Sequence, residues 1–219
     1  RIFGRTEREG YSVEKVEFQS QPGFYCHGNL YRPTSEGPHP GVLCPHGHCQ
    51  NGRLEDSDEF FGSIPGRCIN LARQGHVTFT YDMVGYNDSW QIPHRAFGGR
   101  LEDLWGIGIM GLQLINSSRA LDFLQTLPDV DGDRIGCTGA SGGGTQTFML
   151  TALDKRVRAA APVVMASAHF YGGCNCESGL PVHESKTHKT NNAEIAAMAA
   201  PRPLLLVSVG GDWTKNTPK

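Results

Sequence analysis

Five residues near the middle of the chain constrain its fold more than any other feature. The motif Gly139-Ala140-Ser141-Gly142-Gly143 lies between a short apolar run that ends at Thr138 and a helix-compatible segment that begins at Gly142. In a Gly-x-Ser-x-Gly turn, a strand reverses into a helix so tightly that side chains two residues from the serine would collide, and glycine removes those collisions. The pattern predicts a strand, a sharp turn and a helix. A plain flexible loop is the alternative that these five residues alone leave open.

Length and composition favour one domain that buries a sizeable core. The chain has 219 residues, of which 38% are hydrophobic and 19% are charged, so nothing suggests disorder. The net charge is -2 and no run of lysine or arginine exceeds two residues, which disfavours nucleic acid or an anionic membrane as a partner. No apolar stretch has the length of a membrane span.

The first residues of the chain leave its cellular compartment open. Residues 1–5 lack the apolar core of a signal peptide, and the chain does not begin with methionine. We therefore expect a processed, trimmed or partial product, for which secretion or export to a periplasm stays among the alternatives.

The cysteines do not indicate a disulfide framework. The chain has seven, an odd number, in a domain too large to depend on disulfides. Cys44 and Cys137 lie in apolar runs, and we expect both to be small buried hydrophobic residues. Cys174 and Cys176 lie near histidines, but their spacing matches no common zinc pattern, so a loop-stabilising or buried role is favoured over a metal site.

Strand and helix signals alternate along the chain, which predicts an α/β fold with a mostly parallel sheet. Residues 13–20 and 24–32 alternate apolar and polar side chains around Gln21-Pro22-Gly23, and we expect a hairpin at a sheet edge. Residues 101–127 have apolar residues at helical intervals, but Gly106, Gly108 and Gly111 predict a long helix that is broken near 111. The remaining expected strands are 42–44, 76–81, 134–138, 157–165 and 203–209, and the remaining expected helices are 60–74, 142–153 and 193–200. Residues 168–192 are expected to form a long irregular segment beside the site.

Ser141 is the candidate nucleophile. A serine hydroxyl needs a histidine to take its proton and a carboxylate to orient that imidazole. In folds with this motif the acid follows the serine and lies at the end of a later strand, and Asp212 directly follows the apolar run 203–209 and two glycines. A solvated loop aspartate is the alternative for Asp212.

An oxyanion hole is expected from two backbone amides. One is that of Gly142, the residue after the nucleophile, and the other comes from the loop after strand 42–44, for which His48 is the best candidate. His46 and Gly47 in that loop have two interpretations. We favour a role for His46 in shaping the loop over direct proton transfer by its imidazole.

Four motifs together resemble one family. They are Pro45-His46-Gly47-His48, Tyr81-Asp82-Met83-Val84-Gly85-Tyr86, the serine motif extended to Gly144, and Ala200-Pro201-Arg202-Pro203 followed by Gly211-Asp212-Trp213-Thr214. In their order and spacing, over about residues 12–219, they resemble the α/β-hydrolases of the acetyl xylan esterase-like and dienelactone hydrolase-like type. The resemblance implies hydrolysis of carboxylic esters without metal or organic cofactor, in which plant-derived saccharides would be deacetylated by Ser141 and Asp212.

The chain departs from that family in one respect. The family's histidine follows the acid after one further strand, yet only residues 213–219 follow Asp212 and none of them is histidine. We favour the explanation that the chain is an α/β-hydrolase domain that lacks its C-terminal strand, helix and histidine loop. The alternatives are a base from the long loop, His169, His183 or His188, and a non-catalytic homologue. A chain without the base would be nearly inactive and would expose apolar surface that favours self-association.

Three other classes of function stay open at the level of sequence. A carbohydrate-binding module would use Trp90, Trp105 and Trp213 as stacking platforms, but it gives no reason for a glycine-flanked serine between a strand and a helix. A non-catalytic homologue that binds a partner would keep the fold without the base. A peptidase on the same fold would use the same triad.

Overall fold

The computed structural model describes residues 1–56, 62–168, 187 and 189–208, and Asp212 lies outside this part of the chain. The strands are β1 (Ile2–Arg8), β2 (Tyr11–Gln21), β3 (Phe24–Pro33), β4 (His39–Leu43), β5 (Val77–Tyr81), β6 (Val130–Ala140) and β7 (Val157–Val163). The helices are the 3-10 turn η1 (Gly52–Leu54), α1 (Ile64–Arg73), α2 (Arg100–Trp105), α3 (Ile109–Gln125), α4 (Gly142–Leu153) and α5 (Asn192–Ala197). None of these helices combines the length and apolar character needed to cross a membrane.

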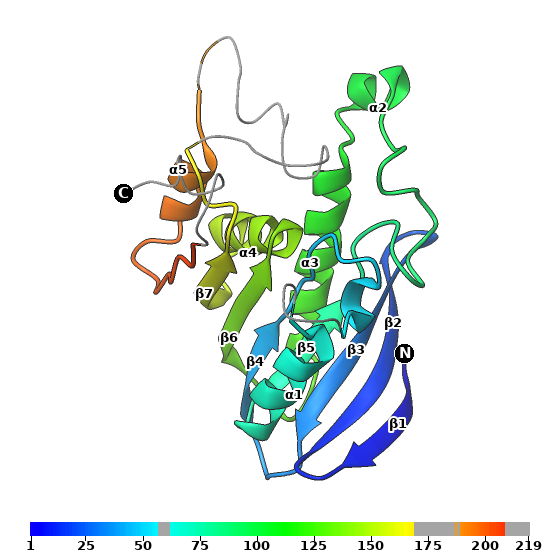
Figure 1. The fold of residues 1–219 in the computed structure, drawn as a ribbon, viewed down its shortest axis with the longest axis vertical. Coiled ribbons are helices and arrows are strands. Elements are labelled where there is room, and N and C mark those ends of the chain that lie inside the picture. The colour runs from blue at the N-terminus through cyan, green and yellow to red at the C-terminus, as the bar shows by residue number, and fades with distance from the viewer. Residues whose placement is uncertain (57–61, 169–186, 188, 209–219) are drawn as a thin grey trace.

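The seven strands form one sheet in the order β1-β2-β3-β5-β4-β6-β7 (Figure 1). The pairs β5–β4, β4–β6 and β6–β7 are parallel, and the pairs that join β1, β2, β3 and β5 are antiparallel. This confirms the predicted α/β fold, in which a parallel set of strands is joined to antiparallel N-terminal strands. The carboxyl ends of β4, β5 and β6 therefore meet at one edge of the sheet.

The predicted hairpin is present as β2 and β3, but it does not form the edge of the sheet. β1 pairs with β2 along its outer side and is the edge strand. Six of its seven residues are exposed. The expectation of an edge hairpin was wrong because an exposed edge strand rich in charged residues, such as Arg5, Glu7 and Arg8, has no apolar alternation to reveal it.

Helices cover both faces of the sheet. Successive residues of the strands alternate between the two cores, so that Leu30 and Leu43 pack with α3 whereas Tyr31 and Cys44 pack with α1. Ser63 caps the N-terminus of α1, because its hydroxyl accepts a 2.7 Å hydrogen bond from the amide of Gly66. Cys44 and Cys137 are both buried, as predicted. Cys174 and Cys176 lie outside the described residues.

The long helix predicted over 101–127 is broken, as expected, but earlier than position 111. α2 ends at Gly106, which adopts a left-handed conformation with φ 65°, and α3 starts after Gly108. Gly111 lies inside α3 without interrupting it. Only Gly106 has the positive φ that ends a helix, because a glycine in ordinary helical geometry lowers stability without forcing a break.

The apolar run predicted as the strand 203–209 lies alongside β7. Leu204 and Val207 form parallel bridges to Ala160 and Val163, and the amide of Val164 donates to the carbonyl of Val207 at 2.8 Å. The described part of this run, up to residue 208, thus extends the sheet beyond β7 in the predicted direction.

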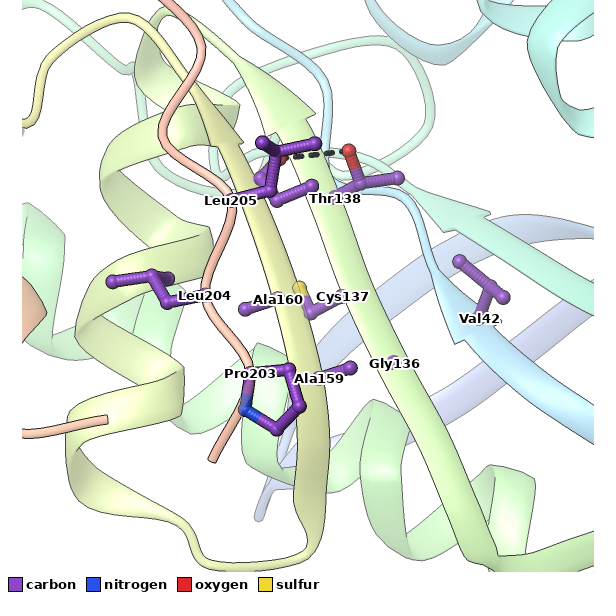
Figure 2. Close-up of a pocket in the computed structure, with 10 residues that line it drawn as sticks. Val42, Gly136, Cys137, Thr138, Ala159, Ala160, Pro203, Leu204 and Leu205 are labelled. Carbon is purple, nitrogen blue, oxygen red and sulfur yellow. Dashed lines mark hydrogen bonds between the residues drawn. The ribbon is translucent and has the colours of Figure 1, made fainter. Parts of the chain in front are cut away.

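One face of β6 and β7 bears a shallow groove on the same side as α1 (Figure 2). The small residues Gly136, Thr138 and Ala159 line this groove, together with the larger Val42 and Leu205. Leu205 is 63% exposed. This face of the sheet therefore bears exposed apolar surface.

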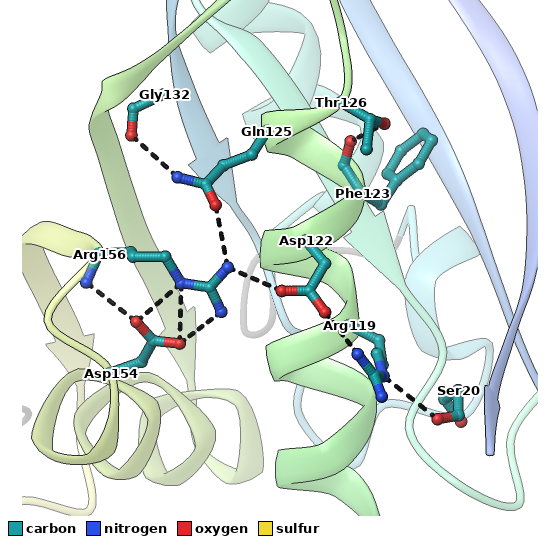
Figure 3. Close-up of polar contacts among 9 residues, drawn as sticks. All are labelled: Ser20, Arg119, Asp122, Phe123, Gln125, Thr126, Gly132, Asp154 and Arg156. Carbon is teal, nitrogen blue, oxygen red and sulfur yellow. Dashed lines mark hydrogen bonds and ion pairs between the residues drawn. The ribbon is translucent and has the colours of Figure 1, made fainter.

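Arg156 and Arg202 make different kinds of contact near the C-terminus of α4. Arg156 forms ion pairs with Asp154 and Asp122 at a partly exposed position (Figure 3). Arg202 instead donates to backbone carbonyls of Thr151 at 2.6 Å and Val157 at 2.8 Å. The guanidinium of Arg202 therefore satisfies the carbonyl of Thr151 in the last turn of α4, where carbonyls have no partner within the helix, and links it to the first residue of β7.

We expect Arg202→Met to cost about 2 to 3 kcal/mol of unfolding free energy, because charged hydrogen bonds to half-buried carbonyls are lost. The control Arg156→Met removes exposed ion pairs and should cost less than about 1 kcal/mol. Urea unfolding followed by circular dichroism measures both values. An equal loss in the two variants would show that the carbonyl contacts of Arg202 have no special weight.

Candidate active site

Ser141 occupies the turn between β6 and α4, where the sequence placed it. Its backbone has φ 56° and ψ -125°, a conformation that residues other than glycine rarely adopt. The amide of Ser141 donates to the carbonyl of Val163 at 3.0 Å, and its carbonyl accepts from the amide of Thr145 at 3.0 Å. The strained residue is therefore held between β7 and the first turn of α4.

Glycines on both sides of Ser141 make this turn sterically feasible. A Cβ atom on Gly139 would lie 2.4 Å from the carbonyl oxygen of Pro45, and one on Gly143 would lie 2.3 Å from the same oxygen. A Cβ on Gly144 would lie 2.5 Å from the carbonyl oxygen of Val163. Because such distances lie far inside van der Waals contact, these glycines allow backbone to pack directly on backbone. The alternative of a plain flexible loop is therefore wrong.

The loop after β4 lies directly against the serine. A Cβ on Gly47 would be 3.0 Å from the Cβ of Ser141 and 2.7 Å from the carbonyl oxygen of Ala140. Gly47 thus brings the segment that contains His48 beside the turn, as expected for an oxyanion loop. Gly142 is buried and begins α4, so its amide is among those that a helix leaves without an intrahelical partner.

His46 is buried and uses both ring nitrogens within the protein. Its Nδ1 donates to the carbonyl of Gly47 at 2.7 Å, and its Nε2 accepts from the amide of Met83 at 2.9 Å. Since an amide can only donate, Nε2 has no proton and the ring is neutral. Burial lowers the pKa of His46 to about 3. This geometry supports a loop-shaping role and leaves His46 no free nitrogen with which to act as the base.

A second histidine pair links the same loop to the loop after β5. His48 Nε2 lies 2.9 Å from His94 Nε2, and His94 Nδ1 donates to the carbonyl of Val84 at 2.7 Å. The ring of Tyr86 contacts the imidazoles of His46, His48 and His94 edge-on, with centroid distances of 5.3, 6.3 and 5.1 Å. His94 was not among the residues predicted for the site. Its only sequence signal was its position after the Tyr81–Tyr86 motif.

A buried ion pair lies next to the histidines of the β4 loop. The guanidinium of Arg53 contacts the fully buried carboxylate of Asp82 and donates to Asp88 at 2.5 Å. Burial raises the pKa of Asp82, and the charge of Arg53 acts against that rise. The pair holds η1 in place, where Gly52 has φ 53° and a Cβ would lie 3.1 Å from Cε1 of His46. By holding η1, the ion pair keeps Gly52 packed against the His46 ring.

The remaining predicted site residues lie outside the described part of the chain. These are the acid Asp212 and the three alternative bases His169, His183 and His188. The structure therefore brings together Ser141, Gly142 and the loop that contains His48, and it leaves the predicted acid untested.

We expect His46 to make the protein less stable as the pH falls. Its folded-state pKa of about 3 lies below the ordinary value of about 6.5. Its contribution is therefore complete above pH 6.5 and is lost on acidification, because only the unfolded chain takes up the proton. Between pH 6.5 and 3, His46 should contribute a slope of about 1.4 kcal/mol per pH unit. Urea unfolding of wild type and His46→Gln at several pH values should show a shallower dependence in the variant, and parallel curves would contradict this assignment.

Comparisons with known proteins agree with this geometry. The protein is similar to the solved structure of methylesterase BT1017, with 38% identity, a TM-score of 0.83, and coverage of 98% of this chain and 46% of that chain. YtaP of Bacillus subtilis strain 168, whose name places it among the hydrolases, is 29% identical over 80% of this chain and 61% of its own length. Acetyl esterase Axe7A of Xylanibacter ruminicola is 24% identical over 68% of this chain and 37% of its own length.

The chain thus spans less than two thirds of the length of each of these relatives. The sequence model of the acetyl xylan esterase (AXE1) family matches residues 5–174. This match includes the β4 loop, the loop after β5 and the Ser141 turn, and it confirms the acetyl xylan esterase-like resemblance. The chain belongs to the acetyl xylan esterase family and has its α/β-hydrolase fold.

Proposed function

We propose that the protein is a serine carboxylic ester hydrolase that acts through an acyl-enzyme. The observation that supports this most directly is the backbone of Ser141, with φ 56° and ψ -125° between β6 and α4 and with Gly47 packed on its Cβ. Strain at a non-glycine residue clusters at functional sites. This strain projects a hydroxyl at the carboxyl edge of the sheet, beside the start of a helix.

The chemistry follows from the groups around the hydroxyl. The Ser141 oxygen attacks the ester carbonyl carbon while a histidine takes the hydroxyl proton. The amides of Gly142 and His48 donate hydrogen bonds to the developing oxyanion. When the C–O bond of the ester breaks, the alcohol leaves with the proton from the imidazolium. A water molecule then gives a proton to the histidine and attacks the acyl carbon, and the histidine returns the proton to Ser141 as the acid is released.

Asp212 is our candidate for the acid that orients the histidine. Val163 pairs with Ala140 on one side and with Val207 on the other, so these three residues form one row across the sheet. Ser141 follows directly after Ala140, and Asp212 follows Val207 by five residues. The described run up to residue 208 is thus parallel to β7, and Asp212 follows it in the sequence, which is the order expected of a hydrolase triad.

We propose that the general base is a histidine outside the described residues. His46 is excluded because both of its nitrogens are bonded within the protein. His48 and His94 bond one another through their Nε2 atoms. The candidates are a histidine beyond these 219 residues or, within the sequence, His169, His183 or His188.

Esters of plant saccharides are the proposed substrate class. The family is described as acetyl xylan esterase, one relative is named an acetyl esterase, and another is named a methylesterase. All three names describe hydrolysis of an ester that contains a small group, acetyl or methyl. We favour acetyl esters of saccharides, with methyl esters of saccharide acids as the alternative within the same chemistry.

Substitution of the nucleophile tests the mechanism. In the full-length protein, Ser141→Ala should lower kcat on p-nitrophenyl acetate by at least about 10³-fold, because the group that forms the acyl-enzyme is lost. A fluorophosphonate should label wild type at Ser141, as located by peptide mass spectrometry. The control Ser35→Ala removes an exposed hydroxyl near the opposite end of β4 and should leave both results unchanged. Labelling elsewhere, or none in wild type, would refute the serine mechanism.

A panel of substrates tests the class. We expect turnover of acetylated xylo-oligosaccharide and p-nitrophenyl acetate, and no turnover of a peptide amide, since the relatives are named for ester chemistry. A methyl-esterified oligogalacturonide serves as the second ester. Cleavage of the peptide alone would replace the esterase proposal with a peptidase, and preference for the methyl ester would replace the acetyl assignment.

A further inference from the structure

The hydrogen bonds of His48 and His94 specify where their protons lie. The carbonyl of Val84 can only accept, so His94 Nδ1 must hold a proton. In the neutral ring His94 Nε2 is then an acceptor, and His48 Nε2 must donate across the 2.9 Å between them. The pair forms a directed chain from the His48 ring through the His94 ring to the backbone of the β5 loop.

His94 is rigidly placed to receive this bond. The residue is 8% exposed, and its backbone nitrogen would lie 2.3 Å from a Cβ on Gly85. Gly85 has φ 86°, which a side chain would also disfavour. The ring of Tyr86 contacts the His94 imidazole edge-on at a centroid distance of 5.1 Å. Position 94 is therefore held by direct backbone packing as well as by the bond to Val84.

The loop after β4 has two such attachments to the loop after β5. His46 accepts from the amide of Met83 before Gly47, and His48 donates to His94 after it. Gly47, between the two histidines, is the residue that packs on the Cβ of Ser141. A hydrogen-bond donor in an oxyanion hole is effective only when it is already in place, because moving it during the reaction costs free energy.

We propose that His94 is a positioning residue that holds the backbone amide of His48 in the oxyanion hole through the bond between the two imidazoles. The inference rests on the proposed function, in which that amide binds the oxyanion. His94 acts only through His48 and takes no proton from the substrate.

Two substitutions at position 94 separate this role from general support of the fold. Asparagine keeps an amide donor near Val84 but is too short to accept from His48. Glutamine places its carbonyl oxygen near the position of Nε2 and restores the acceptor. In the full-length protein with p-nitrophenyl acetate, His94→Asn should lower kcat about 10- to 100-fold with KM changed less than about threefold. His94→Gln should keep kcat within about threefold of wild type.

A matched control removes an imidazole elsewhere. His76 precedes β5 at the opposite end of the sheet, and its Nδ1 lies 3.2 Å from the carbonyl of Leu71. His76→Asn should leave kcat and KM unchanged. Thermal unfolding of every variant shows whether the fold is kept, and ¹⁵N NMR of the wild-type imidazoles reports the proposed protons on His94 Nδ1 and His48 Nε2.

The outcomes distinguish this proposal from the proposed function. Three outcomes would overturn the positioning role: equal kcat values for His94→Asn and His94→Gln, a change in KM alone, or the opposite tautomer of His94. If Ser141→Ala still abolishes turnover in that case, the proposed function stands. In a His48→Ala background, His94→Asn should have no further effect, and additive losses would overturn the role as well. Wild-type turnover that persists in Ser141→Ala, or is absent altogether, would overturn the proposed function and with it this inference.

Discussion

The contact on which the site depends is the packing of the β4 loop on the turn between β6 and α4. The carbonyl of Pro45 lies where side chains at positions 139 and 143 would otherwise be. This close approach, together with the hydrogen bond from Ser141 to Val163, holds a serine in a backbone conformation that costs about 1 to 3 kcal/mol. Any side chain on these glycines would separate the loop from the turn and take Gly47 away from Ser141.

Electrostatics in this region serves the placement of the loop. The neutral ring of His46 accepts from one backbone amide and donates to one carbonyl, and burial of the ring opposes its protonation. Arg53 and Asp82 are buried together behind it. A buried ion pair contributes little net stability when the cost of desolvation is counted. Its structural consequence is to fix η1 against the His46 ring, and the bond between His48 and His94 provides the second attachment of the same loop.

The order of the strands explains how distant parts of the sequence meet. Parallel strands end at the same edge, so the loops after β4, β5 and β6 converge although they are separated by tens of residues. The row of Ala140, Val163 and Val207 extends this alignment to the segment that leads to Asp212. The groove at Val42 and Gly136 lies on the face of the sheet rather than at this edge.

The sequence by itself determined the elements and their order, because these depend on local patterns. The glycines around Ser141 require a tight turn, the alternation before Gly23 and after it requires two strands, and the glycines between 106 and 111 predict a break in a helix, although only the structure shows that Gly106 ends it. The exposed strand β1 has no such pattern and was missed. Only the tertiary structure decided the tautomers of His46 and His94, the pairing of His48 with His94, and the contact of Gly47 with Ser141. These depend on which backbone donors and acceptors meet across loops far apart in the chain, and no local sequence pattern contains that information.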